Sequence, residues 1–185
     1  MKRLFIAIKL NPDEKFLETY NLLKSSLKQD IINWVKPEIM HLTLKFMGPT
    51  PTEDIPKIKA ILSYFCKQKT PIKFEFDKTG IFGSSYDPRV IWFGISKNDE
   101  IKAFGEDLLN LFHESGFKRD RQNFVPHLTI GRIKKIKNKK YFQSIIDKVK
   151  DRKIQLFNVN EIILYQSILK PDGPVYVELG KYELV

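Results

Sequence analysis

The hydrophobic positions of the chain follow two different spacings, and together they predict a protein of mixed helices and strands. Apolar residues recur every three or four positions, as on an amphipathic helix, over residues 13–28, 52–68 and 98–115 and again up to about residue 150. Alternating, β-branched or aromatic stretches predict strands at 3–10, 40–47, 72–77, 89–96, 127–133, 154–159, 161–169 and 175–184. The segments between them, including those that carry Trp34 and Phe124, are predicted loops.

The order of these elements recurs along the chain with a shift of 86 residues. Arg3-Leu4-Phe5-Ile6 corresponds to Arg89-Val90-Ile91-Trp92, and the strand that begins at His41 corresponds to the strand that begins at His127. We interpret the chain as one domain built from two fused copies of a strand–helix–strand–helix unit, approximately residues 1–88 and 89–185. Equivalent residues of a duplicated fold tend to lie around a pseudo-twofold axis, so the two histidines are predicted to face one another across a cleft.

Two of the three histidines begin the same four-residue pattern, His41-Leu42-Thr43-Leu44 and His127-Leu128-Thr129-Ile130. Residues two apart in a strand share a face. Each histidine is therefore predicted to point to the same side as its threonine, while Leu42, Leu44 and Phe46 enter the core. A pair of imidazoles can supply an acid and a base near neutral pH, and threonine hydroxyls can donate hydrogen bonds to phosphate oxygens. This chemistry needs no metal, and the two histidines with Glu38 nearby do not make up a metal site. We therefore expect no metal and no cofactor.

The two motifs resemble those of the two-histidine (2H) phosphoesterases, in particular the LigT-like RNA 2′,3′-cyclic phosphodiesterases, also called 2′-5′ RNA ligases. The likeness includes Phe46 and Gly48 after the first motif and Arg132 after the second, and it runs from residues 4–8 to the tail at 167–176. It implies an α+β, bilobal duplicated fold with two antiparallel sheets around a central cleft and helices on the outside.

The same resemblance implies metal-independent hydrolysis of RNA 2′,3′-cyclic phosphate ends to 2′-phosphates. His41 would be the proton donor, His127 the proton acceptor that activates water, and Thr43 and Thr129 the residues that hold the phosphate. The residues themselves leave other uses of the site open. These are a 2′-5′ RNA ligase, a phosphodiesterase for a small cyclic nucleotide, and a non-catalytic module that binds RNA ends.

Arg132 does not follow from simple alternation, because a regular strand would place it on the face opposite His127 and Thr129. Gly131, directly before it, would permit a β-bulge that turns the guanidinium back toward the cleft. Two interpretations of Arg132 therefore stand, a phosphate ligand and a surface or salt-bridged arginine.

Composition adds a basic surface and an intracellular setting. The net charge of +10 and the pI of about 9.5 favour a polyanionic partner such as RNA, without specifying one. The single cysteine, Cys66, allows no internal disulfide and lies in the apolar stripe of a predicted helix, so it is interpreted as a core residue. No stretch approaches a membrane span, and we expect a cytoplasmic monomer that does not contact a membrane.

The remaining candidates for function lie outside the two motifs. The basic run at residues 134–140 is either a solvated loop or a contact for the RNA backbone. His113, near the end of a predicted helix, is interpreted as a surface histidine. Four aromatic residues are candidates either for the core or for stacking on a base: Trp34, Tyr86, Phe124 and Tyr176.

Overall fold

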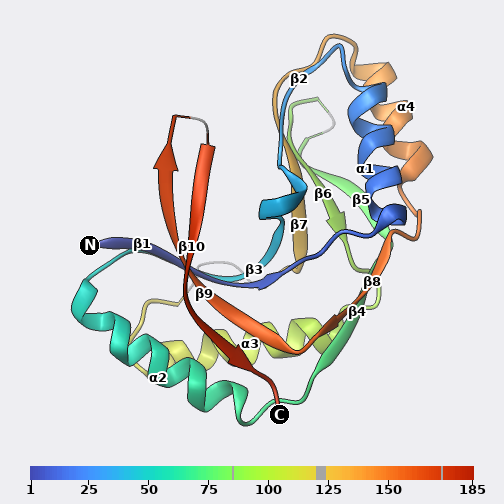
Figure 1. The fold of residues 1–185 in the computed structure, drawn as a ribbon. Coiled ribbons are helices and arrows are strands. Elements are labelled where there is room, and N and C mark those ends of the chain that lie inside the picture. Colours follow the sequence, from blue (N-terminus) through green and yellow to red (C-terminus); the bar gives the residue numbers. More distant parts are fainter. Residues whose placement is uncertain (85, 120–123, 172) are drawn as a thin grey trace.

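A computed structural model describes residues 1–84, 86–119, 124–171 and 173–185, and it contains four α-helices and ten strands within those ranges (Figure 1). The helices are α1 (Glu14–Ser26), α2 (Ile55–Cys66), α3 (Asp99–Glu114) and α4 (Lys139–Val149). The strands are β1 (Lys2–Lys9), β2 (Ile31–Trp34), β3 (His41–Thr50), β4 (Ile72–Phe76), β5 (Lys78–Gly83), β6 (Pro88–Gly94), β7 (His127–Lys135), β8 (Gln155–Val159), β9 (Glu161–Lys170) and β10 (Gly173–Glu183).

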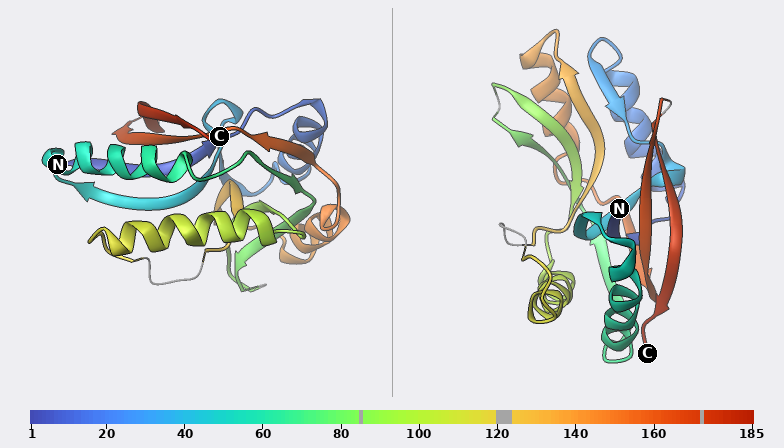
Figure 2. Two further views of the ribbon diagram at one scale, coloured as in Figure 1. Left: turned by 90° about the horizontal axis from the view of Figure 1, so that it is seen from below. Right: turned by 90° about the vertical axis from the view of Figure 1, so that its left-hand side faces the viewer.

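Two four-stranded antiparallel sheets, A and B, form the centres of two lobes, which we call lobe A and lobe B. Sheet A has the order β10-β9-β1-β3, and sheet B has the order β2-β7-β6-β5. Helices α2 and α3 contact each other and sheet A, whereas α1 and α4 lie side by side along sheet B (Figures 1 and 2). The predicted α+β fold with antiparallel sheets and outer helices is therefore confirmed.

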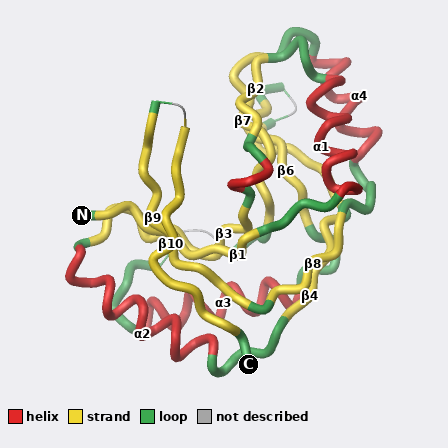
Figure 3. The backbone as a smooth tube through the Cα atoms, viewed as in Figure 1, coloured by secondary structure: helices red, strands yellow, loops and turns green. Residues whose placement is uncertain are grey.

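A third sheet was not expected from the sequence. β4 and β8 pair with each other alone, and this ribbon joins the two lobes on the side remote from Lys170 and Gly173, which pair at the ends of β9 and β10 (Figure 3). Its side chains Phe74, Phe76 and Phe157 pack in one aromatic group that reaches Phe16 of α1. One continuous hydrophobic core consequently runs through both lobes and holds them as a single unit.

The lobes do not coincide with the two halves of the chain. Helix α1 and strand β5, from the first half, belong to lobe B, whereas α3 and β9, from the second half, belong to lobe A. With a shift of 86 residues, β1, β3 and β5 correspond to β6, β7 and β9. β5, from the first half, therefore pairs with β6 in sheet B. β9, from the second half, pairs with β1 in sheet A.

Most boundaries agree with the predicted elements within a few residues, and two strands were missed. β2 lies in the segment predicted as the loop with Trp34, and β5 lies in the segment between the predicted strands at 72–77 and 89–96, which was predicted as a loop. The predicted helix stop at Gly116 is confirmed, since its φ of +89° and the bond from its N–H to the His113 carbonyl end α3. Cys66 is buried in the core, as expected.

Candidate active site

Matching β-bulges decide which way the residues after each histidine point. In sheet A, Ile6 pairs with Lys45 and Ala7 pairs with Thr43, which leaves Leu44 as the extra residue of β3. In sheet B, Ile91 pairs with Gly131 and Trp92 pairs with Thr129, which leaves Ile130 as the extra residue of β7. Leu44 and Ile130 are separated by the same 86 residues as the histidines. A bulge inserts one residue and so reverses the alternation beyond it.

The bulge in β7 places Arg132 on the same face as His127 and Thr129. Burial follows this pattern, because Ile130 and Gly131 are both buried while Arg132 is exposed and Ile133 is buried again. The bulge considered for Gly131 is therefore present, although the extra residue is Ile130. We call this side of sheet B, and the side of sheet A that carries His41, the inner faces.

The bulge in β3 overturns the expectation that Phe46 enters the core. Leu44 and Lys45 are buried, and Phe46 is 64% exposed on the inner face of sheet A. Lys45 instead takes the core-facing position that alternation had given to Phe46. Its ammonium group donates to the Lys118 carbonyl at 3.1 Å. Phe46 thus occupies the position in sheet A that Arg132 occupies in sheet B.

The two histidines make the same hydrogen bond to the backbone. Nδ1 of His41 lies 2.9 Å from the carbonyl oxygen of Ile39, and Nδ1 of His127 lies 2.8 Å from the carbonyl oxygen of Val125. A carbonyl oxygen only accepts, so Nδ1 carries the hydrogen in each ring. Nε2 is then the nitrogen left to exchange a proton with a ligand.

An aromatic group surrounds His41 on the inner face of sheet A. The His41 ring lies 4.8 Å from the ring of Phe5 and 5.1 Å, edge to face, from the ring of Tyr176. Tyr165 stacks on Phe5 at 5.2 Å. These side chains belong to a small cluster separate from the main core. Together with the bond to the Ile39 carbonyl, these ring contacts fix the orientation of the imidazole.

His127 has an aromatic support of its own on the inner face of sheet B. Its ring meets Phe82 edge to face at 4.8 Å, and Phe82 lies 5.3 Å from Trp92. Trp92 pairs with Thr129, and Gly94 pairs with His127. A Cβ atom at Gly94 would lie only 2.4 Å from the Trp92 ring, so the glycine leaves the space that the indole fills. Sequence reasoning missed Phe82, because no strand was predicted over β5.

The two histidine strands are held close together. β3 and β7 contact each other, and β2, which pairs with β7, leads directly through residues 35–40 into His41. Within this connection the Val35 N–H donates to the Ile130 carbonyl at 2.9 Å, and the Tyr20 hydroxyl donates to the Val35 carbonyl at 2.8 Å. The short link therefore ties the start of β3 to the bulge of β7.

Electrostatics also connect the two inner faces. Burial raises the pKa of the Tyr176 hydroxyl, and the nearby positive charges of Arg132 and Arg3 oppose that rise. Arg132 of sheet B is therefore near the aromatic group around His41 of sheet A.

Both threonines, Thr43 and Thr129, are partly exposed, and no described residue makes a hydrogen bond to either hydroxyl.

A pocket opens beside His41. It is lined by Lys9, Glu38, Tyr165, Tyr176 and Glu178 together with the chain leading into β3. Burial lowers the pKa of His41, and the bond to the Ile39 carbonyl partly opposes this effect. Burial also raises the pKa of Tyr165 to about 12, with Glu178 and Glu161 adding to it, so this phenol stays protonated at neutral pH. Within the described ranges, no three histidine, cysteine or carboxylate side chains are grouped as metal ligands would be.

The other candidates divide between core and surface. Trp34 packs on the main core against Tyr20, and Phe124 is buried against Gly105 of α3, so both are core residues. Tyr176 lies beside His41, Tyr86 is exposed, and His113 is exposed in the last turn of α3. In the part of the chain that the structure describes, no helix is long and apolar enough to cross a membrane.

Comparison with known proteins identifies the family of this chain. A family model described as the 2′-5′ RNA ligase superfamily matches residues 18–169. A Methanocaldococcus jannaschii protein named RNA 2′,3′-cyclic phosphodiesterase is 39% identical over 94% of this chain and 96% of its own length. A protein of the same name from Archaeoglobus fulgidus is 32% identical over 98% of this chain and 99% of its own length.

Solved structures show the same fold. The crystal structure of TT0787 from Thermus thermophilus aligns with a TM-score of 0.81 and 26% identity over 98% of this chain and 97% of its own. The structure of E. coli LigT complexed with 3′-AMP aligns with a TM-score of 0.72 over 100% of this chain and 98% of its own, at 20% identity. The fold is that of the 2H phosphoesterases. The chain belongs to the 2′-5′ RNA ligase superfamily, and the resemblance seen in its sequence is confirmed.

Proposed function

We propose that this protein hydrolyses RNA 2′,3′-cyclic phosphate ends to 2′-phosphates without a metal, with His41 and His127 as its acid and base. The observation that carries the proposal is the equivalence of the two histidines. Each begins its strand, each donates from Nδ1 to the carbonyl two residues earlier, and each presents Nε2. The names of the M. jannaschii and A. fulgidus relatives supply the substrate class.

The reaction can be written with the residues on the two inner faces. The cyclic phosphate lies between them, with Thr43 and Thr129 donating to its non-bridging oxygens and Arg132 compensating its negative charge. Nε2 of His127 takes a proton from water as the water oxygen bonds to phosphorus. The bond between phosphorus and the 3′ oxygen breaks, and Nε2–H of His41 protonates that oxygen. The product keeps the phosphate on the 2′ oxygen.

Burial has a defined consequence for His41 as the donor. Its lowered pKa favours the neutral ring in the free enzyme. A bound phosphate anion beside the ring stabilises the imidazolium and restores the donor. The acid is thus formed together with the substrate complex, and aromatic packing by Phe5 and Tyr176 keeps it oriented until then.

The first test is hydrolysis of a short RNA that ends in a 2′,3′-cyclic phosphate, with EDTA present and the product end identified. We expect a 2′-phosphate. An unchanged end with the RNA bound would indicate a binding module. An unchanged end without binding, together with hydrolysis of a small cyclic nucleotide, would indicate a nucleotide phosphodiesterase.

A second experiment separates the donor from the acceptor. His41→Ala and His127→Ala should each lower kcat by about 10²–10⁴-fold, the usual contribution of a general acid or base. Replacement of the 3′ oxygen by sulfur gives a leaving group with a pKa of about 8.5 that departs without protonation. This substrate should restore the rate of His41→Ala but not of His127→Ala. If this substrate instead restored the rate of His127→Ala, His127 would be the proton donor and His41 the acceptor.

A further inference from the structure

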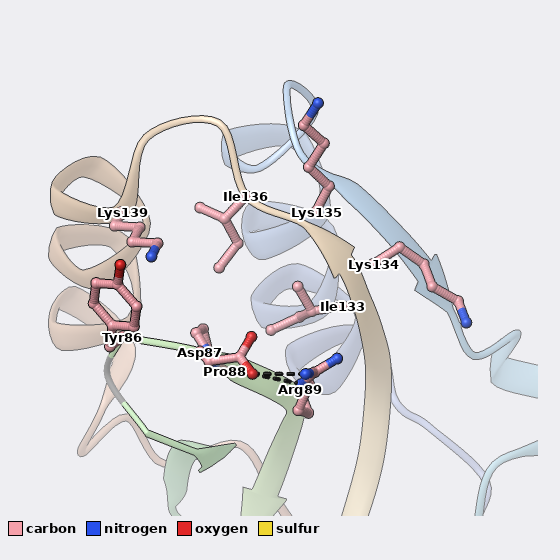
Figure 4. A pocket seen from close by; sticks show the side chains of 9 residues that line it. All are labelled: Tyr86, Asp87, Pro88, Arg89, Ile133, Lys134, Lys135, Ile136 and Lys139. Atoms are coloured by element: carbon pink, nitrogen blue, oxygen red, sulfur yellow. Dashed lines mark hydrogen bonds and ion pairs between the residues drawn. The ribbon is translucent and has the colours of Figure 1, made fainter.

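A second pocket, with a basic lining, lies at the far end of β7 from His127, at the tip of lobe B. Its walls come from the β5–β6 turn with Tyr86, from the end of β7 with Lys134 and Lys135, and from the first residue of α4, Lys139 (Figure 4). Arg89, at the start of β6, completes it. None of these residues lines the pocket beside His41.

Tyr86 and Lys139 form the centre of this tip pocket. The Lys139 ammonium lies 3.5 Å from the centroid of the Tyr86 ring, a close cation–π contact. Tyr86 is nevertheless 78% exposed, so the ring retains a face open to solvent. An exposed aromatic ring next to ammonium groups suits a base and its phosphate, because the base stacks on the ring while the ammonium groups neutralise the phosphate.

The charge of the tip pocket is mostly uncompensated. Asp87 is its one carboxylate, and Arg89 already engages that group, with Nη2 2.7 Å from Oδ2. Among the described residues, no carboxylate lies within ion-pair distance of Lys134, Lys135 or Lys139. The ammonium groups of Lys135 and Lys139 therefore create a positive potential that a phosphate backbone would neutralise, and Lys134 adds a further positive charge from the other side of β7.

Basic side chains on the inner face lead from His127 toward the tip, whereas Tyr86 and Lys139 lie on the other side of β7, so an RNA strand that follows the inner face would pass over the end of β7 to reach them. Beyond Ile130 the alternation places Arg132 and Lys134 on the inner face with His127, and Figure 4 shows Lys134 on the opposite side of β7 from Tyr86 and Lys139. A strand rises about 3.3 Å per residue, so Lys135 lies roughly 26 Å from His127 along β7. A stacked single strand spans that distance with about eight nucleotides at about 3.4 Å each, and an extended strand needs fewer.

We propose that the tip pocket binds the upstream part of the substrate RNA, with a base on Tyr86 and the adjoining phosphates on Lys135 and Lys139, while the cyclic end lies between the histidines. The inference rests on the proposed function for the position of the cyclic end. It gives the enzyme a preference for single-stranded RNA long enough to reach from the histidines to the tip.

The test compares a dinucleotide with a 12-nucleotide RNA, each ending in a 2′,3′-cyclic phosphate. Tyr86→Ala should raise KM for the 12-mer by about fivefold or more, which corresponds to the lower range of base–aromatic stacking. It should leave kcat and the dinucleotide KM unchanged. Tyr86→Phe keeps the ring and should behave as the unmodified protein does.

The lysines are tested through salt dependence. Lys135→Ala/Lys139→Ala should weaken binding of the 12-mer, followed by fluorescence anisotropy. The slope of log Kd against log salt should fall by about 1.4, because each RNA phosphate that a lysine neutralises contributes about 0.7. The matched control is Lys59→Ala/Lys67→Ala, which removes two exposed lysines from α2 and its C-terminal end in lobe A. The control should bind the 12-mer more tightly than the tip variant does.

The outcomes separate this inference from the proposed function. Equal KM and Kd values for the 12-mer in the tip variants and the control would overturn the tip site, even if the dinucleotide is hydrolysed normally. If the unmodified protein cleaves neither substrate but binds the 12-mer in a manner that depends on Tyr86, the proposed reaction fails and the tip site stands.

Discussion

Replacement of Gly94 by alanine tests the packing that supports His127. Gly94 pairs with His127, and the ring of Trp92 covers it. Without a steric conflict, alanine in a strand should be about 0.5–1 kcal/mol more stable than glycine. The structure predicts the opposite sign, because the new Cβ atom would lie 2.4 Å from Cζ3 of Trp92, whereas ordinary contact begins at 3.4 Å.

The difference between these distances, 3.4 Å less 2.4 Å, means that the indole or the strand must move by 1.0 Å. Overpacking of this kind costs about 1–3 kcal/mol. For a protein of this size, each kcal/mol lowers Tm by about 2–4 °C, so Tm should fall by about 2–12 °C. Trp92 pairs with Thr129, so the shift would also displace the histidine–threonine pair of sheet B. A misplacement of about 1 Å can lower kcat by about 10²-fold.

Thermal unfolding by circular dichroism and kcat on a short cyclic-phosphate RNA would measure both effects. In the Trp92→Leu background, Gly94→Ala should cost little or become stabilising, because the ring that it meets is gone. A Gly94→Ala variant as stable and active as the unmodified protein would refute the reasoning. So would an equal loss of stability in both backgrounds, since the conflict would then not involve Trp92.

Three further predictions follow from burial and exposure. Burial lowers the pKa of His41, so as pH rises the imidazole of the free protein should lose its proton with a midpoint below pH 6.5, which an NMR titration of the ring would measure; a midpoint above about pH 7 would contradict its burial. Phe46→Ala should change the free energy of unfolding by less than about 0.5 kcal/mol, whereas Leu44→Ala should lower it by about 2–5 kcal/mol. Urea unfolding would measure both values, and a larger loss for Phe46→Ala than for Leu44→Ala would contradict the assigned faces. Burial raises the pKa of the Cys66 thiol to about 12, so native protein should not react with a thiol reagent at about pH 8 and urea-unfolded protein should; rapid reaction of the native form would contradict its burial.

The candidate histidines were predictable because their pattern is local and repeated. A histidine and a threonine two apart in a strand must share a face, and two copies with the same shift indicate equivalent positions. The long helices and most strands were predictable for the same reason, since their periodicity is strong. β2 and β5 were missed because both are short and lie beside turn residues, and they are strands through pairing with β7 and β6.

Two features of the site required information that no local pattern contains. The orientation of Phe46 and Arg132 depends on the register of β3 against β1 and of β7 against β6, where one extra residue in each histidine strand reverses the faces. The aromatic groups around the histidines come from β1, β5, β9 and β10, and only the sheet order places them there.

The sequence by itself determined the family, the identity of the two candidate catalytic histidines and the presence of antiparallel sheets with outer helices. These depend on short-range spacing, which strand and helix geometry translates directly into faces. The tertiary structure alone decided that each lobe draws strands from both halves, and that Phe46 and Arg132 both lie on the inner faces. It also decided that Tyr86 meets Lys139 at the tip of lobe B. Such outcomes depend on register and on contacts between residues far apart in the chain, which are settled only when the whole core packs.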